Sequence, residues 1–149
     1  MNQSLKESSN LLTADLKKLK IFLQKNSEVD FRKADLLHTP NLKKYKWIKF
    51  KDEDEKTRVL NLLKAYQRML RIVPKGREDV AMILLEGGFQ SSVQIVNTPK
   101  KAFLKFFQSD RELGKNVLKR AIAVHKIVTL QYIARVEQAQ PHARAVSRL

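Results

Sequence analysis

The side chains best suited to acid–base chemistry are three histidines, His38, His125 and His142. A nucleophilic serine or threonine needs a neighbouring base to take its proton. None of the three histidines stands at a recognisable spacing from serine and aspartate. Two of them fall inside or beside predicted helices, and the third lies in the C-terminal tail. The sequence therefore predicts ordinary histidines, no catalytic residue and no enzyme.

Metal and cofactor signatures are also missing from the sequence. It has no cysteine, no His-x-x-x-His pair and no EF-hand pattern, which are the usual carriers of zinc and calcium. Four acidic residues stand together at 52–55, but carboxylates at a helix start serve capping and solvation. Gly87-Gly88 lacks the Lys-Ser/Thr of a phosphate loop and follows no predicted strand. We expect neither a metal site nor a cofactor.

The composition bounds the class of protein. The chain has 149 residues, 43% of them hydrophobic, and a net charge of +15. Such a length corresponds to one domain with a buried core. Such a charge suggests polyanionic partners such as nucleic acid or anionic lipid, although a lysine-rich solvated surface is the more ordinary explanation. No apolar run approaches the roughly 18–20 residues of a membrane span, and no signal peptide is visible. We expect a protein made in the cytoplasm, which leaves the cell, if at all, by a non-classical route.

Apolar residues spaced three and four apart, with few breakers, predict an all-α bundle of about seven or eight helices. Residues 1–12 are polar and are expected to form a flexible leader. Thr13 is then expected to cap the first helix, whose apolar face includes Leu16, Leu19 and Phe22. The region 13–139 is expected to form a single all-α domain, and residues 140–149 a C-terminal tail or linker.

Caps and breakers locate the next elements. Asp30 is expected to cap a short helix over 31–37. The Thr39-Pro40 step is expected to start another, with threonine as N-cap and proline at the first helical position. Tyr45 and Trp47 would contribute to the apolar side of that helix. The acidic run at 51–56 then opens a long amphipathic helix.

The second half repeats similar signals. Gly87 is predicted to be a left-handed C-cap, and Thr98-Pro99 is expected to start a helix with threonine as its cap. Ser109 and Glu112 fit a capping box ahead of a long helix at about 114–139. The predicted core face of this helix consists of Val117, Leu118, Ala121, Val124, Val128, Tyr132 and Val136.

The parallel order of these signals predicts an internal duplication. Matched pairs, 58 or 59 residues apart, are Phe31 with Phe89, Thr39-Pro40 with Thr98-Pro99, Val59 with Val117, and Leu60 with Leu118. The sequence therefore predicts two related helical units, about 28–73 and 78–139, related by a pseudo-two-fold axis. Each unit is expected to bury the open apolar face of the other.

The same order of elements resembles the tandem helix-hairpin-helix domains of DNA-processing proteins. That resemblance implies a glycine-rich hairpin whose N–H groups hold a phosphate. The corresponding segments here, 50–56 and 108–114, are acidic and lack the G-x-G pattern. Lys115, Lys119 and Arg120 remain candidate contacts for weak, sequence-independent binding of nucleic acid. A nucleic-acid-binding domain is therefore the alternative function.

A second resemblance covers roughly residues 27–149. The stretch "LLEGGFQSSVQIVNTPKKAFLKFF", followed by "LGKNVLKRAIAVHKIVTLQYI" and "QPHARAVSRL", resembles a helical segment of the A components of bacterial Tc (toxin complex) insecticidal toxins and their neuraminidase-like relatives. "DLLHTPNLKKYKW" and "LLKAYQRMLRI" resemble the part just upstream.

The Tc resemblance implies a helical shell module of a large secreted toxin. A components form pentamers that bind cells and translocate a toxic cargo. The present chain is unusually rich in lysine, so the pore and receptor functions do not carry over to it. We expect a non-enzymatic structural or protein-interaction module whose partners are other subunits or adjacent domains of a toxin or injection assembly. Its working surface would be helix faces and the basic exterior.

Overall fold

The computed structural model describes residues 2–139, which form seven α-helices, one 3₁₀-helix and no strand. This confirms the prediction of an all-α fold. The predicted tail, 140–149, lies outside the described residues. Contacts divide the chain into two units, Met1–Ser91 and Ser92–Leu149, which we call the N-terminal and C-terminal units.

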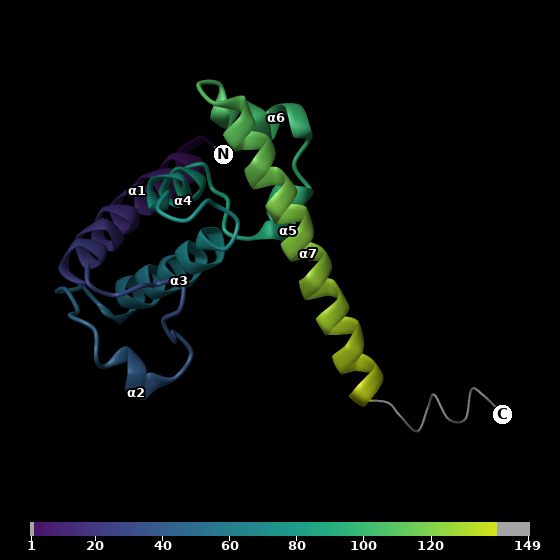
Figure 1. The fold of residues 1–149 in the computed structure, drawn as a ribbon. Helices are drawn as coiled ribbons and strands as arrows, with labels where there is room; N and C mark the ends of the chain where they lie inside the picture. Colours follow the sequence, from purple (N-terminus) through teal and green to yellow (C-terminus); the bar gives the residue numbers. More distant parts are fainter. Residues whose placement is uncertain (1, 140–149) are drawn as a thin grey trace. The chain divides into compact units, whose positions relative to one another are not determined.

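The N-terminal unit contains four helices: α1 (Asn2–Lys25), α2 (Thr39–Leu42), α3 (Glu53–Leu70) and α4 (Glu78–Glu86). Within this unit, α3 packs against both α1 and α4 (Figure 1). Leu16, Leu19 and Phe22 of α1 are buried, as the sequence predicts. The core of this unit therefore forms where the apolar sides of three helices meet.

The first helix begins earlier than the sequence predicts. α1 starts at Asn2, so the predicted leader over 1–12 and the predicted helix start at Thr13 are wrong. Thr13 lies inside the helix, where its hydroxyl donates a hydrogen bond to the Ser9 carbonyl at 2.9 Å. A threonine can bond back to the preceding turn instead of capping. No glycine or proline interrupts residues 2–12, so nothing in the sequence stops the helix there.

The segment after α1 is a turn instead of the predicted short helix over 31–37. The Asp30 carbonyl accepts hydrogen bonds from the N–H groups of Lys33 and Ala34, both at 3.1 Å. The Asp30 carboxylate accepts from the N–H of Arg32 at 3.0 Å. These local bonds compete with helix formation, as aspartate side chains do in turns.

Asp35 organises the start of α2. Its carboxylate accepts hydrogen bonds from the N–H groups of Leu37 and His38, at 2.9 and 3.3 Å, and from the Asn41 amide at 2.9 Å. These bonds, above all the one from Leu37, hold the pKa of Asp35 well below its usual range. The N-cap is His38 and not the predicted Thr39, which is the first helical residue.

Aromatic packing fixes the segment that follows α2. Tyr45 and Trp47 lie after the helix has ended, and not on it as predicted. The ring centroids of Phe22 and Trp47 are 4.8 Å apart, and those of Phe22 and Tyr45 are 6.5 Å apart. The buried side chain of Asn26 accepts a hydrogen bond from the Lys46 N–H at 2.8 Å and donates one to its carbonyl at 3.0 Å. An irregular segment is thereby held against the end of α1.

A left-handed glycine ends α4, one residue later than predicted. Gly88 has a φ of 88°, whereas Gly87 is right-handed with a φ of −78°. The N–H of Phe89 donates to the Leu84 carbonyl at 2.9 Å, and that of Gly88 to the Leu85 carbonyl at 3.0 Å. This pair of bonds is the Schellman motif, which requires the positive φ that glycine adopts without strain.

The C-terminal unit contains α5 (Ser92–Val96), α6 (Lys100–Leu104), the 3₁₀-helix η1 (Lys105–Phe107) and α7 (Arg111–Ala139). α7 packs against α5, α6 and η1, and Figure 1 shows these short elements beside its N-terminal half. The cap of α6 is Pro99 and not the predicted Thr98. The Thr98 hydroxyl instead donates back to the Gln94 carbonyl at 2.7 Å.

Helices α3 and α7 begin with the same hydrogen bond, at positions 58 residues apart. The Asp52 carboxylate accepts from the Glu55 N–H at 2.8 Å, and the Asp110 carboxylate accepts from the Leu113 N–H at 3.1 Å. Asp110 therefore caps α7, and the predicted cap at Ser109 is wrong. A cap of this kind typically stabilises a helix by about 1 kcal/mol. The two aspartate caps are therefore expected to stabilise their helices to a similar extent.

Burial follows the predicted duplication for only part of each helix. Val59 and Val117 are both buried, and so are Leu63 and Ala121, which are the corresponding pairs of α3 and α7. Beyond them the two helices differ, because α3 stays buried to its last turn whereas Ile127 of α7 is 55% exposed. The two helices are therefore alike in their caps and first turns, and the duplication stays a prediction.

Three of the seven residues on the predicted core face of α7 are exposed. Val117 and Ala121 are buried, but Val128, Tyr132 and Val136 are exposed, which corrects the sequence prediction. The partners of α7 within its unit are helices of five residues or fewer. Since a helix rises about 1.5 Å per residue, such short elements cover only a fraction of a helix of 29 residues.

Candidate functional site

The residues predicted to contact nucleic acid all lie on α7, but they do not share one face. Lys115 and Lys119 are one turn apart, so they point to the same side, whereas Arg120 is rotated by about 100° from Lys119. Lys115 lies 3.6 Å from the carboxylate of Glu112. All three predicted contact residues are exposed.

The segment at the position of a helix-hairpin-helix hairpin, 108–114, has N–H groups that are bonded within the chain itself. The N–H of Leu113 donates to the carboxylate of Asp110, and that of Gly114 to its carbonyl, at 3.1 and 3.2 Å. The N–H of Asp110 donates to the Phe107 carbonyl at 2.9 Å. These donors are therefore engaged, and the acidic cap occupies the position where a helix-hairpin-helix domain would hold a phosphate.

A groove on the C-terminal unit collects basic residues that the sequence analysis did not single out. It has a volume of about 530 Å³ and lies where α6 and η1 meet the start of α7. Its lining residues, which define the basic groove, are Lys100, Lys101, Leu104, Lys105, Gln108 and Arg111. Leu104 is buried, whereas the four cations are exposed.

The charge of the basic groove is uncompensated. Its lining includes no carboxylate, and none of its four cationic side chains forms an ion pair within residues 2–139. The two nearest carboxylates in the sequence are engaged elsewhere, Asp110 with the Leu113 N–H and Glu112 with Lys115. The sequence feature that could have indicated this groove is the run "KKAFLK" at 100–105, which is followed six residues later by Arg111.

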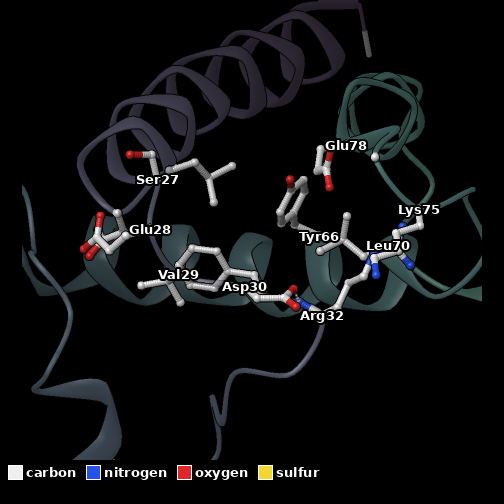
Figure 2. A pocket seen from close by; sticks show the side chains of 13 residues that line it. Ser27, Glu28, Val29, Asp30, Arg32, Tyr66, Leu70, Lys75 and Glu78 are labelled. Atoms are coloured by element: carbon white, nitrogen blue, oxygen red, sulfur yellow. Dashed lines mark hydrogen bonds between the residues drawn. The ribbon is translucent and has the colours of Figure 1, made fainter.

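A second pocket lies in the N-terminal unit, between the end of α1, the turn after it, α3 and the 74–78 segment (Figure 2). Its volume is about 430 Å³. Charged side chains of both signs line it: Glu28, Asp30, Glu78, Arg32 and Lys75. Because carboxylates slightly outnumber cations, this pocket favours neither a simple anion nor a simple cation.

Among the ionisable groups that line this pocket, Tyr66 has the most strongly shifted pKa. Its side chain is 5% exposed, and its hydroxyl has no hydrogen-bond partner in the part of the chain that the structure describes. Burial, and then the charge of Glu78, raises the pKa of Tyr66 to about 12, and the nearby Arg32 opposes this rise. Arg32 is itself held by hydrogen bonds to the carbonyls of Val73 and Pro74, at 3.2 and 3.0 Å. The tyrosine is therefore a neutral donor at ordinary pH, without a base to activate it.

Tyr66→Phe is expected to flatten the pH dependence of stability in alkaline solution. The folded state keeps the phenolic proton up to about pH 12, whereas a free tyrosine loses it near pH 10.0. The resulting stabilisation is present below pH 10 and is lost as the pH rises towards 12. Urea unfolding across this range should show a steep fall in wild-type stability and a shallower fall in the variant. Tyr132→Phe, at an exposed position, is the control and should behave as the wild type.

The three histidines are not brought together as a reactive set. The His38 ring lies 2.5 Å from the carboxylate of Asp35, at the start of α2. His125 is half-buried on α7 in the other unit, and its Nδ1 atom is buried without a partner. His142 lies outside the described residues. Within the described chain, no group of three or more His, Asp or Glu side chains is arranged to hold a metal ion.

From Ile122 onwards, α7 carries an apolar surface that the other described elements of its unit leave uncovered. Five large apolar residues, between 40% and 67% exposed, define the distal α7 face: Ile122, Val128, Tyr132, Ile133 and Val136. With successive residues rotated by about 100°, these side chains fall within an arc of about 140°. The arc contains no charged residue, and Lys126 and Arg135 border it on its two sides.

Comparison with protein-family models, curated proteins and solved structures finds no match to this chain. Among residues 2–139, no helix has the length and apolar character needed to cross a membrane. The described residues offer three candidate surfaces: the basic groove, the Tyr66 pocket and the distal α7 face.

Proposed function

We propose that the chain is a non-enzymatic structural and protein-interaction module of a Tc-toxin-like or related secreted or injected toxin assembly. The observation that supports this proposal is the distal α7 face, a run of exposed apolar side chains that none of the other described elements of the unit covers. Exposed apolar surface of this kind is typical of protein-binding sites. The sequence resemblance to Tc A components suggests the kind of assembly.

The distal α7 face has the features of a helix that docks into a partner. Tyr132 lies near its centre, and tyrosine is among the residues that contribute most to binding at protein interfaces. Lys126 and Arg135 at the borders would be met by carboxylates at the rim of the partner surface. The expected partner is therefore another subunit or an adjacent domain that presents an apolar groove with an acidic rim.

Val128→Glu/Tyr132→Glu tests this proposal. The chain is to be co-expressed with each protein encoded beside it, and the complexes are to be quantified by co-purification and calorimetry. The double variant is expected to keep its helical content, because both residues are exposed, and to bind its neighbour at least tenfold more weakly. Two charges would then be buried without counter-ions at the interface.

The matched control is Ile127→Glu/Leu130→Glu, which introduces the same charges on the other side of the same helix. Both of these residues are also exposed, at 55% and 65%. The control should bind as the wild type does. Equal losses in both double variants would refute a specific face, and the absence of any complex with a neighbouring gene product would refute the assembly function.

A further inference from the structure

Four cations form a row along α7 that begins at the basic groove. Arg111, Lys115, Lys119 and Lys126 are separated by four, four and seven residues. With a rotation of about 100° per residue, their side chains fall within an arc of about 80°, over about 22 Å of the helix. All four are exposed, and of them Lys115 alone is paired with a carboxylate within residues 2–139, that of Glu112 at 3.6 Å.

The groove extends this row to a second element. Lys100, Lys101 and Lys105 come from α6 and η1, and Arg111 belongs to both the groove and the row. Seven cations from α6, η1 and α7 thus form a cationic track within one unit. Like charges held this closely repel one another, so the track favours an anionic ligand that neutralises several of them at once.

We propose that this track binds the phosphodiester backbone of a nucleic acid without reading its sequence. The site is new with respect to the contact residues expected from the helix-hairpin-helix resemblance. It includes Lys115 and Lys119, it leaves out Arg120, and it is centred on the groove instead of the closed hairpin. The inference does not depend on the protein-interaction function, because the two sites share only Lys126, which borders the distal α7 face.

The geometry favours a phosphate chain over other polyanions. The charges lie in a concave groove and then follow a line, which suits a narrow polymer with regularly spaced charges. A flat membrane surface would reach the exposed row but not the interior of the groove. The lysine and arginine side chains of the track would contact phosphate oxygens, and such contacts carry no sequence information, so binding should be independent of sequence.

The test is fluorescence anisotropy with the full chain and a labelled mixed-sequence duplex. If four phosphates are contacted, the slope of log affinity against log salt should be about −3.6, which corresponds to a loss of about 150-fold between 50 and 200 mM salt. Lys101→Gln/Lys105→Gln should reduce the magnitude of this slope by about 1.8 and weaken binding at 50 mM by at least tenfold.

Lys43→Gln/Lys44→Gln is the matched control, because it removes the same charge from two exposed lysines of the N-terminal unit. It should change affinity by less than about twofold, since it removes no phosphate contact. Equal losses in both variants would mean attraction by net charge alone and would overturn the proposal. So would a wild-type chain that does not bind at 50 mM salt.

Two further titrations decide the class of ligand. Polyglutamate and vesicles of phosphatidylserine and phosphatidylcholine present dense negative charge without a phosphodiester chain. Both should bind at least tenfold more weakly than the duplex at equal salt, and the groove variant should affect them less. Tighter binding to polyglutamate would identify an acidic protein segment as the ligand, and tighter binding to vesicles a lipid surface. Either result would refute the nucleic-acid proposal.

Discussion

Leu63→Asp is expected to unfold the N-terminal unit at 25 °C. Leu63 is 1% exposed on α3, the helix that contacts both α1 and α4. Removing a buried leucine costs about 2–5 kcal/mol, and burying an unpaired carboxylate costs several more. Since domains are stable by only about 5–15 kcal/mol, the sum approaches the whole stability. Far-UV circular dichroism and thermal melting measure the effect.

Leu37→Asp is the control for this substitution. Leu37 was placed on a predicted helix, but it is 81% exposed in the turn before α2. The same chemical change there should leave the melting temperature almost unaltered. Similar losses from Leu63→Asp and Leu37→Asp would show that the core is assigned incorrectly.

The corresponding test of the C-terminal unit is Val117→Asp. Val117 is fully buried, whereas Val124, which the sequence places on the same core face, is only half-buried. Val117→Asp should therefore destabilise this unit much more than Val124→Asp, because the charge at position 124 can reach water. Amide exchange of α7, resolved by residue, distinguishes the two variants. An equal effect would contradict the burial of α7 described above.

Gly114→Val is expected to disrupt the packing of α7 against η1. A Cβ atom at position 114 would lie 2.8 Å from the Cβ of Phe107 and 3.1 Å from the Cδ2 of Leu104. The Phe107 atom is next to the backbone, so it cannot move without shifting η1. Overpacking of this kind costs about 1–3 kcal/mol, and the two additional methyl groups of valine bring the expected loss to the upper end or beyond.

A comparison with Ala separates packing from helix propensity. Replacing an exposed helical glycine by alanine normally stabilises a protein by about 1 kcal/mol. Gly114→Ala should instead lower the melting temperature, because the added Cβ meets Phe107. Ala123→Val, on the exposed side of α7, is the control and should have little effect. A higher melting temperature for Gly114→Ala would rule out the close approach.

The sequence predicted the helical class well because apolar residues spaced three and four apart mark the side of a helix that can be buried. Leu63 lies in a regular pattern of steps of three and four, and it is buried as expected. On α7 the same kind of pattern misled, since Val128 and Tyr132 follow the spacing of a core face but are exposed. Periodicity shows which side of a helix is apolar, but it does not show how long the neighbouring helices are.

Helix ends were predicted less well, for a local reason. Threonine and serine can cap a helix, but they can equally bond to the turn before it, as Thr13 and Thr98 do. The actual caps of α3 and α7 are aspartates, Asp52 and Asp110. In each case the choice depends on which hydroxyl or carboxylate reaches a free N–H, and composition alone does not determine this.

The candidate sites were the least predictable part. The basic groove depends on residues of α6 meeting the first residue of α7, and this requires a close approach that Gly114 permits. In the sequence, the lysines of α6 are indistinguishable from ordinary lysines on a solvent-exposed surface. The Tyr66 pocket likewise joins Arg32 and Glu78, which are far apart in the sequence. Neither juxtaposition follows from local spacing.

Helix α7 is buried in its first turns and exposed in its later ones, so its two ends are expected to tolerate substitution differently. Its first turns, around Gly114 and Val117, are fixed by steric fit, so almost any exchange there endangers the fold. Past Ile127, the described residues of the helix are exposed. That stretch is free to adapt to whatever it touches outside, and new specificities can arise there without loss of the scaffold that carries them.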